Sequence, residues 1–387
     1  MNHQISDRVL SIEESKSVAL ASVVQRLRSE GKTIIGLNVG EPELPTPKVV
    51  IEATKKALDE GQTRYSLVPG IVTLREKIAE RSQKKLAFDV KPENIIVGSG
   101  SKNVIFSVLQ AIINPGDEVI IPLPYWVTFP ESVKLAGGIP KSVMPGKNFS
   151  LDIDAIRKVC SQNTKAIIIN SPNNPSGAIF SREQLQEIAA LAKEFDFYII
   201  ADEAYEAILY PEASFTHIAC LDEETRKRTL TIQSFSKSYL MTGFRVGYLV
   251  ASEEVVKMVN RFNSHMLGNI SVYSQVGALT ALTHEDKILG DLLPEMKKRR
   301  DLAYELFSQI FDIQCPEGAF YLFADVSSFL EKSGETDIEF AARILEETQV
   351  AVLPGSAFGL ENHIRICFAV PTEQLQLAYD RLKGMKL

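Results

Sequence analysis

The chain has 387 residues, 45% of them hydrophobic and 24% charged, which is long enough for two or three domains and typical of a globular protein. Its net charge of −7 without a basic run excludes a nucleic acid partner. The N-terminal segment MNHQISDRVLSIEESKS lacks the apolar core of a signal peptide, and no apolar stretch approaches the roughly 20 residues of a membrane span. We therefore expect no membrane partner and a cytoplasmic location. Four cysteines without CxxC spacing and five unpaired histidines predict no metal site and free, mostly core cysteines.

Apolar runs alternate with helical patterns over most of the first 285 residues. The expected strands lie at residues 94–100, 117–122, 165–170, 198–205 and 229–237, and the runs KNVIFSVLQAII and REQLQEIAALAKEF are expected helices. The strands are continuously apolar rather than alternating, which is typical of a parallel sheet covered on both faces. The sequence therefore predicts an α/β protein with a largely parallel sheet.

The pattern changes after about residue 285. A long charged helix, HEDKILGDLLPEMKKRRDLAYELFSQI, precedes the runs FYLFADVS and IRICFAV, a helix near 337–347 and a last helix. This order predicts a smaller α+β domain. We expect the helix and strand at 16–38 to pack with that domain and the long helix to act as the hinge between the two.

Polar residues follow the expected strands at their carboxyl ends, where ligands bind in open α/β sheets. Gly98-Ser99-Gly100-Ser101-Lys102-Asn103 opens a helix after the first strand, and free N–H groups at a helix start favour an anion. This motif alone is also compatible with a tight turn. Asp202 ends another buried strand and needs a partner there, because an unpaired buried carboxylate is costly, although a helix cap would also explain it.

One segment places a lysine among hydroxyls. Residues 234–248, SFSKSYLMTGFRVGY, hold Lys237 between Ser236 and Ser238, and Arg245 follows eight positions later. A surface stretch has no need of this arrangement. A site that holds a phosphate beside a reactive amine needs a hydroxyl cluster, a fixed cation and a nitrogen nucleophile.

These motifs together resemble one family. Asn-Pro-Ser-Gly at 174–177, Asp-Glu-Ala-Tyr at 202–205 and Ser-Phe-Ser-Lys at 234–237 with Arg245 resemble the class I aminotransferases, pyridoxal-phosphate enzymes of fold type I. The segments at 40–47, 64–79, 124–131, 316–323, 354–359 and 364–369 also look like this family. The resemblance implies a large cofactor domain at 45–285 with a mostly parallel seven-stranded sheet, and a small α+β domain from 1–44 and 286–387.

The resemblance also implies roles for the residues around the cofactor ring. Lys237 would hold the aldehyde of pyridoxal 5′-phosphate as a Schiff base and later move the substrate proton. Asp202 would pair with the pyridinium nitrogen and keep the ring an electron sink. Asn174 and Tyr205 would bind the phenolic oxygen. Trp126, the only tryptophan, would stack on the ring, although a core position would suit its residue type equally well.

The phosphate would be held by two groups of residues. They are the helix start Gly100, Ser101 and Lys102, and the segment residues Ser234, Ser236 and Arg245. Tyr65 resembles the tyrosine that reaches the phosphate from a neighbouring subunit, which implies a homodimer.

The substrate carboxylates would meet two cations. Arg365 lies in an otherwise apolar strand and resembles the clamp for the substrate α-carboxylate, with the Gly40 N–H alongside; a structural ion pair is the alternative. Lys102 resembles a lysine that helps to bind the distal carboxylate in bacterial aspartate aminotransferases; a solvated first-turn lysine is the alternative.

The sequence thus predicts an aminotransferase that exchanges the amino group of an L-amino acid with a 2-oxo acid, aspartate with 2-oxoglutarate being the preferred pair. An aromatic or prephenate-type aminotransferase is the second choice, and a pyridoxal-phosphate C–S β-lyase shares the same fold and lysine. A non-catalytic binding module is the alternative of another class, which the presence of Lys237, Asp202 and Arg365 disfavours.

Overall fold

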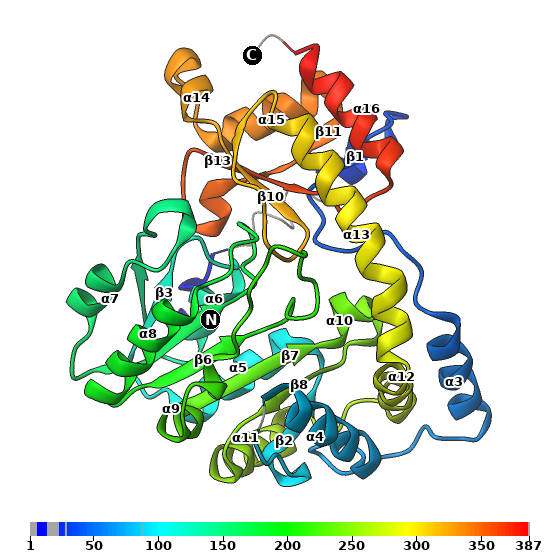
Figure 1. Cartoon of the computed structure of the whole chain (residues 1–387), viewed down its shortest axis with the longest axis vertical. Helices are drawn as coiled ribbons and strands as arrows, with labels where there is room; N and C mark the ends of the chain where they lie inside the picture. The colour runs from blue at the N-terminus through cyan, green and yellow to red at the C-terminus, as the bar shows by residue number, and fades with distance from the viewer. Residues whose placement is uncertain (1–5, 14–22, 28, 87, 386–387) are drawn as a thin grey trace, which may run out of the picture.

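The computed structural model describes residues 6–13, 23–27, 29–86 and 88–385. Within them the elements form a broad central sheet flanked by helices, with a smaller sheet and its helices above it (Figure 1). The central sheet has seven strands, in the order β2 (Ile95–Gly98), β8 (Gly247–Val250), β7 (Thr229–Ser234), β6 (Tyr198–Asp202), β5 (Thr164–Asn170), β3 (Glu118–Pro122) and β4 (Ile139–Val143).

The predicted α/β fold with a mostly parallel sheet is confirmed. Strands β7, β6, β5, β3 and β4 run parallel to one another, and β8 is antiparallel to both β2 and β7. Strands β4 and β8 were not among the expected strands. Strand β4 reads IPKSV and is partly exposed at the sheet edge, so it carries no continuous apolar run.

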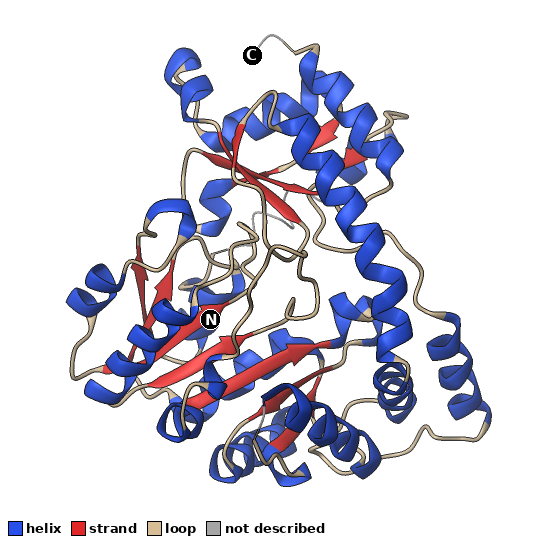
Figure 2. Ribbon diagram, in the orientation of Figure 1, coloured by secondary structure: helices blue, strands red, loops and turns tan. Residues whose placement is uncertain are grey.

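Helices cover both faces of the central sheet (Figure 2). Alternate residues of one strand enter different clusters: Ile168 packs with α5 and α6 on one face, whereas Ile167 and Ile169 pack with α8 on the other. The bounds are α3 (Lys48–Asp59), α4 (Val72–Leu86), α5 (Gly100–Ile112), α6 (Thr128–Leu135), α7 (Ile153–Val159), α8 (Arg182–Glu194), α9 (Glu223–Arg228), α10 (Phe235–Ser238), α11 (Glu253–Met266) and α12 (Val272–Thr283). A short helix, α1 (Asp7–Leu10), precedes them.

The second layer of structure is built around a four-stranded sheet. Its order is β12 (Leu353–Pro354), β13 (His363–Cys367), β10 (Tyr321–Asp325) and β9 (Asp312–Ile313), and all its pairings are antiparallel. Strand β1 (Ile35–Gly36) pairs in parallel with β11 (Val350–Ala351), so the N-terminal strand packs here as expected. Part of the helix expected from residue 16 lies outside the described residues. The helices are α14 (Ser327–Ser333), α15 (Asp337–Thr348) and α16 (Thr372–Lys383).

The predicted long helix is present. Helix α13 runs from Glu285 to Phe307 with Pro294 in its interior, and it rises from the base of the central sheet to the upper sheet (Figure 1). Short 3₁₀ helices lie at Pro92–Asn94, Lys147–Phe149, Ile218–Cys220, Thr242–Phe244 and Gly355–Phe358.

Two further expectations concern the burial of the cysteines and the absence of membrane-spanning helices. All four cysteines are free, but only Cys367 is buried, and the other three are half-buried rather than in the core. None of the helices in the described part of the chain is both long and apolar enough to cross a membrane.

Candidate active site

The carboxyl ends of β5 and β6 and helix α10 face a cavity of about 380 Å³ between the central and the upper sheet. Eight of the residues singled out from the sequence line it: Gly40, Ser101, Trp126, Asn174, Asp202, Tyr205, Lys237 and Arg365. Parallel strands end at the same sheet edge, which explains why residues from distant motifs meet. The volume is within the ordinary range of small-molecule sites.

Asp202 is a buried carboxyl at the end of β6. Its side chain is 3% exposed and accepts a hydrogen bond from the Ala204 backbone N–H at 3.2 Å. The protein cation expected to pair with it is absent from the described residues. Burial, with a contribution from the neighbouring Glu203, raises the pKa of Asp202 to about 7. A protonated nitrogen of a ligand would stabilise the ionised form of this buried carboxyl, because it would supply the positive charge that the protein does not.

Lys237 presents its amine to the same cavity. It lies in α10, and its Nζ donates a hydrogen bond to the Gly40 carbonyl oxygen at 2.6 Å. Burial lowers the pKa of Lys237 to about 8, so a substantial fraction of the amine is neutral and nucleophilic near that pH.

Arg365 is a buried cation on β13. Its Nη1 donates to Asn174 Oδ1 at 2.9 Å and its Nη2 to the Asn38 carbonyl oxygen at 2.7 Å, while Nε has no partner. The guanidinium carbon lies 4.4 Å from the ring centroid of Tyr321 and 4.9 Å from that of Phe358. No carboxylate in the described part of the chain pairs with it. The structural ion pair is therefore absent, and the charge remains available to an anionic ligand.

Tyr205 meets a residue that the sequence did not single out. Its hydroxyl lies 2.8 Å from the Tyr321 hydroxyl, and both rings are buried. The two residues are 116 positions apart, and the contact joins the segment after β6 to β10 of the upper sheet. Tyr321 also approaches Gly40 so closely that a Cβ there would lie 2.5 Å from the Tyr321 hydroxyl. A side chain at position 40 would therefore clash with Tyr321 unless that ring moved.

The start of helix α5 places Ser101 in the lining of the cavity, whereas Gly100, Ser234 and Ser236 lie outside that lining. Gly100 has φ +78°, and a Cβ on it would lie 2.5 Å from Arg245 Nη2. Gly247 on β8 is equally constrained, since a Cβ there would lie 2.5 Å from the Ser101 backbone nitrogen. Ser234 caps α10 by accepting from the Ser236 N–H at 3.2 Å. Hydroxyls, a guanidinium and helix N–H groups thus gather where an anion would be stabilised.

Lys102 and Arg245 line an adjoining hollow of about 590 Å³ next to the cavity. Lys102 Nζ lies 5.0 Å from the Trp126 ring centroid. Partial burial and the nearby Arg245 lower the pKa of Lys102. Tyr65 lies elsewhere on the surface, with 98% of its side chain exposed.

Eight further residues line the cavity, and the sequence assigned no role to them. They are Asn38, Val39, Val127, Asn170, Ala204, Tyr321, Leu353 and Phe358. Asn170 could have been found, because it directly ends the apolar run KAIIIN. Its amide donates to the Asp202 carbonyl oxygen at 3.0 Å and its Oδ1 accepts from the Asn174 N–H at 2.9 Å, so it aligns two site residues.

Known proteins resemble this chain over nearly its whole length. Residues 32–382 match the family described as aminotransferase class I and II. A "Probable aspartate/prephenate aminotransferase" of Aquifex aeolicus is 39% identical, covering 99% of this chain and 98% of the relative. An "Aspartate aminotransferase" of Bacillus subtilis is 34% identical with 98% of each covered. The solved aspartate aminotransferase of Thermus thermophilus with maleate has a TM-score of 0.93 at 35% identity, covering 98% of this chain and 99% of that one.

The described residues suit the cofactor of that family, pyridoxal 5′-phosphate. An anion cradle, an amine with a lowered pKa and a buried carboxyl without a protein cation lie in and beside one cavity. These are the groups that a phosphate, an aldehyde and a pyridine nitrogen require. The chain belongs to the class I and II aminotransferases and is a pyridoxal-phosphate-dependent aminotransferase of fold type I.

Proposed function

We propose that this enzyme transfers the amino group of L-aspartate to 2-oxoglutarate in two half-reactions. The observation that carries the proposal is the buried Arg365 guanidinium, which has no carboxylate partner and faces the same cavity as Lys237 and Asp202. Such a cation is stabilised when a substrate carboxylate completes its hydrogen bonds.

The polar residues of the cavity divide the tasks of this reaction, and Lys237 has two of them. Bound pyridoxal phosphate supplies an electron sink for the charge that develops when the substrate Cα loses its proton. Lys237 binds the cofactor and moves that proton, and its lowered pKa suits a base that works near neutral pH. Asp202 would hold the ring nitrogen in its protonated form. Asn174 and Tyr205 would hold the phenolic oxygen, and Trp126 would stack on the ring.

The phosphate would be held by residues in and beside the cavity, around the starts of α5 and α10. They are Gly100, Ser101, Ser234, Ser236 and Arg245, with Lys102 beside them. The Gly40 N–H and Arg365 hold the substrate α-carboxylate. Tyr65 reaches the phosphate of a second subunit, and its nearly complete exposure in the single chain is compatible with burial in a homodimer.

Lys102 binds the side-chain carboxylate of the substrate. It lies over Trp126 in the adjoining hollow, and a charge-assisted hydrogen bond there is worth about 1.5–3 kcal/mol. The names of the Bacillus subtilis and Thermus thermophilus relatives support aspartate, and maleate is a dicarboxylate. The Aquifex name includes prephenate, and an aromatic aminotransferase of Pyrococcus horikoshii shares the fold with a TM-score of 0.86, so aromatic or prephenate-type substrates are the second candidate.

We also propose the domain division at residues 45–285, with 1–44 and 286–387 forming the small domain. The separate central and upper sheets and the course of α13 support it.

The test compares Lys102→Ala with the parent on L-aspartate and L-phenylalanine. We expect a fall in kcat/KM for aspartate of about 10- to 150-fold and a small change for phenylalanine. Lys48→Ala, at the exposed first position of α3, is the matched control for a first-turn lysine. Equal losses on both donors would reduce Lys102 to a cofactor contact. Release of pyruvate and ammonia from cysteine without a 2-oxo acid would favour the β-lyase.

A further inference from the structure

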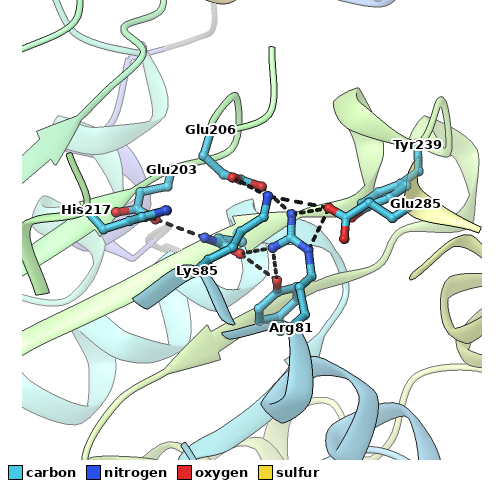
Figure 3. Close-up of polar contacts among 9 residues, drawn as sticks. Arg81, Lys85, Glu203, Glu206, His217, Tyr239 and Glu285 are labelled. Atoms are coloured by element: carbon cyan, nitrogen blue, oxygen red, sulfur yellow. Dashed lines mark hydrogen bonds and ion pairs between the residues drawn. The ribbon is translucent and has the colours of Figure 1, made fainter. Parts of the chain in front are cut away.

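A network of charged side chains lies behind the segment that follows β6 (Figure 3). Asp202 and Tyr205 line the cavity, whereas Glu203 and Glu206 are buried in this network instead. The remaining charged members come from α4, from the residue before the 3₁₀ helix Ile218–Cys220 and from the start of α13. They are Arg81, Lys85, His217 and Glu285.

Arg81 joins the segment to three other elements. Its Nη2 lies 2.5 Å from Glu206 Oε1 and 2.8 Å from Glu285 Oε1, and its Nη1 donates to Gln233 Oε1 at 2.9 Å. Lys85 Nζ lies 2.9 Å from Glu206 Oε2. Burial alone would raise the pKa of Glu206, but the two cations outweigh it and lower that pKa to about 2. Glu206 is therefore ionised near neutral pH.

Two further hydroxyls face the same charges. The Tyr248 hydroxyl donates to Gln233 Oε1 at 2.5 Å, and the Tyr239 hydroxyl donates to Glu285 Oε1 at 3.0 Å. Burial raises the pKa values of both tyrosines, so they remain neutral. Cys220 also lies near Glu203, and burial raises the pKa of its thiol to about 11. None of these three groups changes charge near neutral pH.

Glu203 is held from two sides. Its Oε2 accepts from Gln233 Nε2 at 2.9 Å and lies 2.8 Å from His217 Nδ1. The side chain of Glu203 is 4% exposed and that of His217 12%. Burial alone would lower the pKa of His217, but the Glu203 carboxylate outweighs it and that pKa lies above its ordinary value. The imidazole is the side chain of this network whose ordinary pKa lies closest to neutral pH, and the Glu203 carboxylate favours its protonated form.

Protonation of His217 changes the net charge of the buried network. Arg81 and Lys85 contribute two positive charges, and the three carboxylates contribute three negative ones. The buried network carries one net negative charge when His217 is neutral and none when it is protonated. Glu203 is the chain neighbour of Asp202, so this change of charge occurs next to the active-site carboxyl.

We propose that His217 is a positioning residue that acts through Glu203 to set the protonation of Asp202. The proposal rests on the role proposed above for Asp202 as the partner of the cofactor ring nitrogen. When His217 is protonated, the network is neutral and Asp202 ionises more easily. When His217 loses its proton, the network gains a negative charge. That charge raises the pKa of Asp202, so the proton shared between Asp202 and the cofactor ring nitrogen is retained to higher pH.

The test measures the carboxyl pKa of Asp202 in the apoenzyme. The γ-carbons of aspartate are labelled with ¹³C, and the Asp202 signal is assigned by its loss in Asp202→Asn. In His217→Asn the amide nitrogen replaces Nδ1 as the donor to Glu203 but cannot take up a proton. The pKa of Asp202 should then rise by about one pH unit. His284→Asn is the matched control, since the His284 ring also bonds through Nδ1, to the Thr280 carbonyl oxygen, on the exposed surface.

A second variant guards against a folding defect. Glu203→Gln removes the negative charge and keeps the shape, so the pKa of Asp202 should fall and the imidazole pKa of His217 should return toward its ordinary value. Asp202 pKa values that agree within about 0.2 pH units in the parent and in whichever of the two variants folds would overturn the proposal.

Cofactor binding separates this proposal from the role of Asp202 itself. Trp126 is the only tryptophan and lines the cavity, so its fluorescence reports the binding of pyridoxal phosphate to the apoenzyme. If Asp202→Asn binds the cofactor as tightly as the parent, the proposed role of Asp202 fails even where the coupling between His217 and Asp202 is observed. Weakened binding without that coupling would overturn only the role of His217.

Discussion

Replacement of Arg365 by lysine should weaken the use of every amino donor. Two of the Arg365 nitrogens already donate to Asn174 and to the Asn38 carbonyl, and Nε is unpaired, so the planar group can complete its bonds with a substrate carboxylate. Lysine keeps the charge but loses the two-pronged geometry and the stacking between Tyr321 and Phe358. One lost charge-assisted hydrogen bond costs about 1.5–3 kcal/mol, so kcat/KM should fall about 10- to 150-fold.

The assay follows the absorbance of the bound cofactor in single half-reactions with L-aspartate and L-phenylalanine. Phenethylamine, which is phenylalanine without the carboxylate, is the control substrate. The parent should prefer phenylalanine over phenethylamine strongly, and Arg365→Lys should lose most of that preference while its rate with the amine changes little. A loss confined to aspartate would show that Arg365 reads the side chain. Unchanged rates with all three substrates would refute the role of Arg365.

Two further predictions follow from the buried titratable groups. Because the pKa of Asp202 is raised to about 7, its ionised form destabilises the apoenzyme above that pH, and this penalty disappears as the pH falls toward 3.8. Asp202→Asn should therefore raise the apoenzyme free energy of unfolding at pH 8 by roughly 1–4 kcal/mol, as measured by urea denaturation, while it abolishes most turnover; a less stable apoenzyme would show that Asp202 is structural. The pKa of Lys237, near 8, predicts that a small amine-reactive reagent modifies it in the apoenzyme with a midpoint near pH 8, as followed by peptide mass spectrometry. A midpoint near 10.5, the ordinary lysine value, would contradict the burial of its amine.

The strand-end residues were predictable because parallel strands end at one sheet edge. Asp202 directly follows one apolar run and Asn174 lies in the turn after another, and the structure brings them to one cavity. Lys237 was predictable from its unusual neighbours. Arg365 was identified because a charge interrupts an apolar strand, which requires a compensating contact.

Other parts of the site depend on contacts between distant segments, which local patterns do not encode. Tyr321 enters the cavity from β10 and meets Tyr205 only because the upper sheet lies over the central one. Gly247 has no distinctive sequence context. A larger residue is excluded there because its Cβ would clash with the backbone nitrogen of Ser101. His217 lies in a loop, and its contact with Glu203 follows from the path of the chain after β6.

The most direct test of transamination is a single half-reaction of the holoenzyme with L-aspartate in the absence of any 2-oxo acid. A transaminase should form one equivalent of oxaloacetate per active site and no ammonia. The cofactor absorbance should change completely, and the original spectrum should return when 2-oxoglutarate is added. Lys237→Ala should show no such cycle. Continuous release of ammonia, or an unchanged spectrum with aspartate and with every other amino acid tried, would contradict transamination.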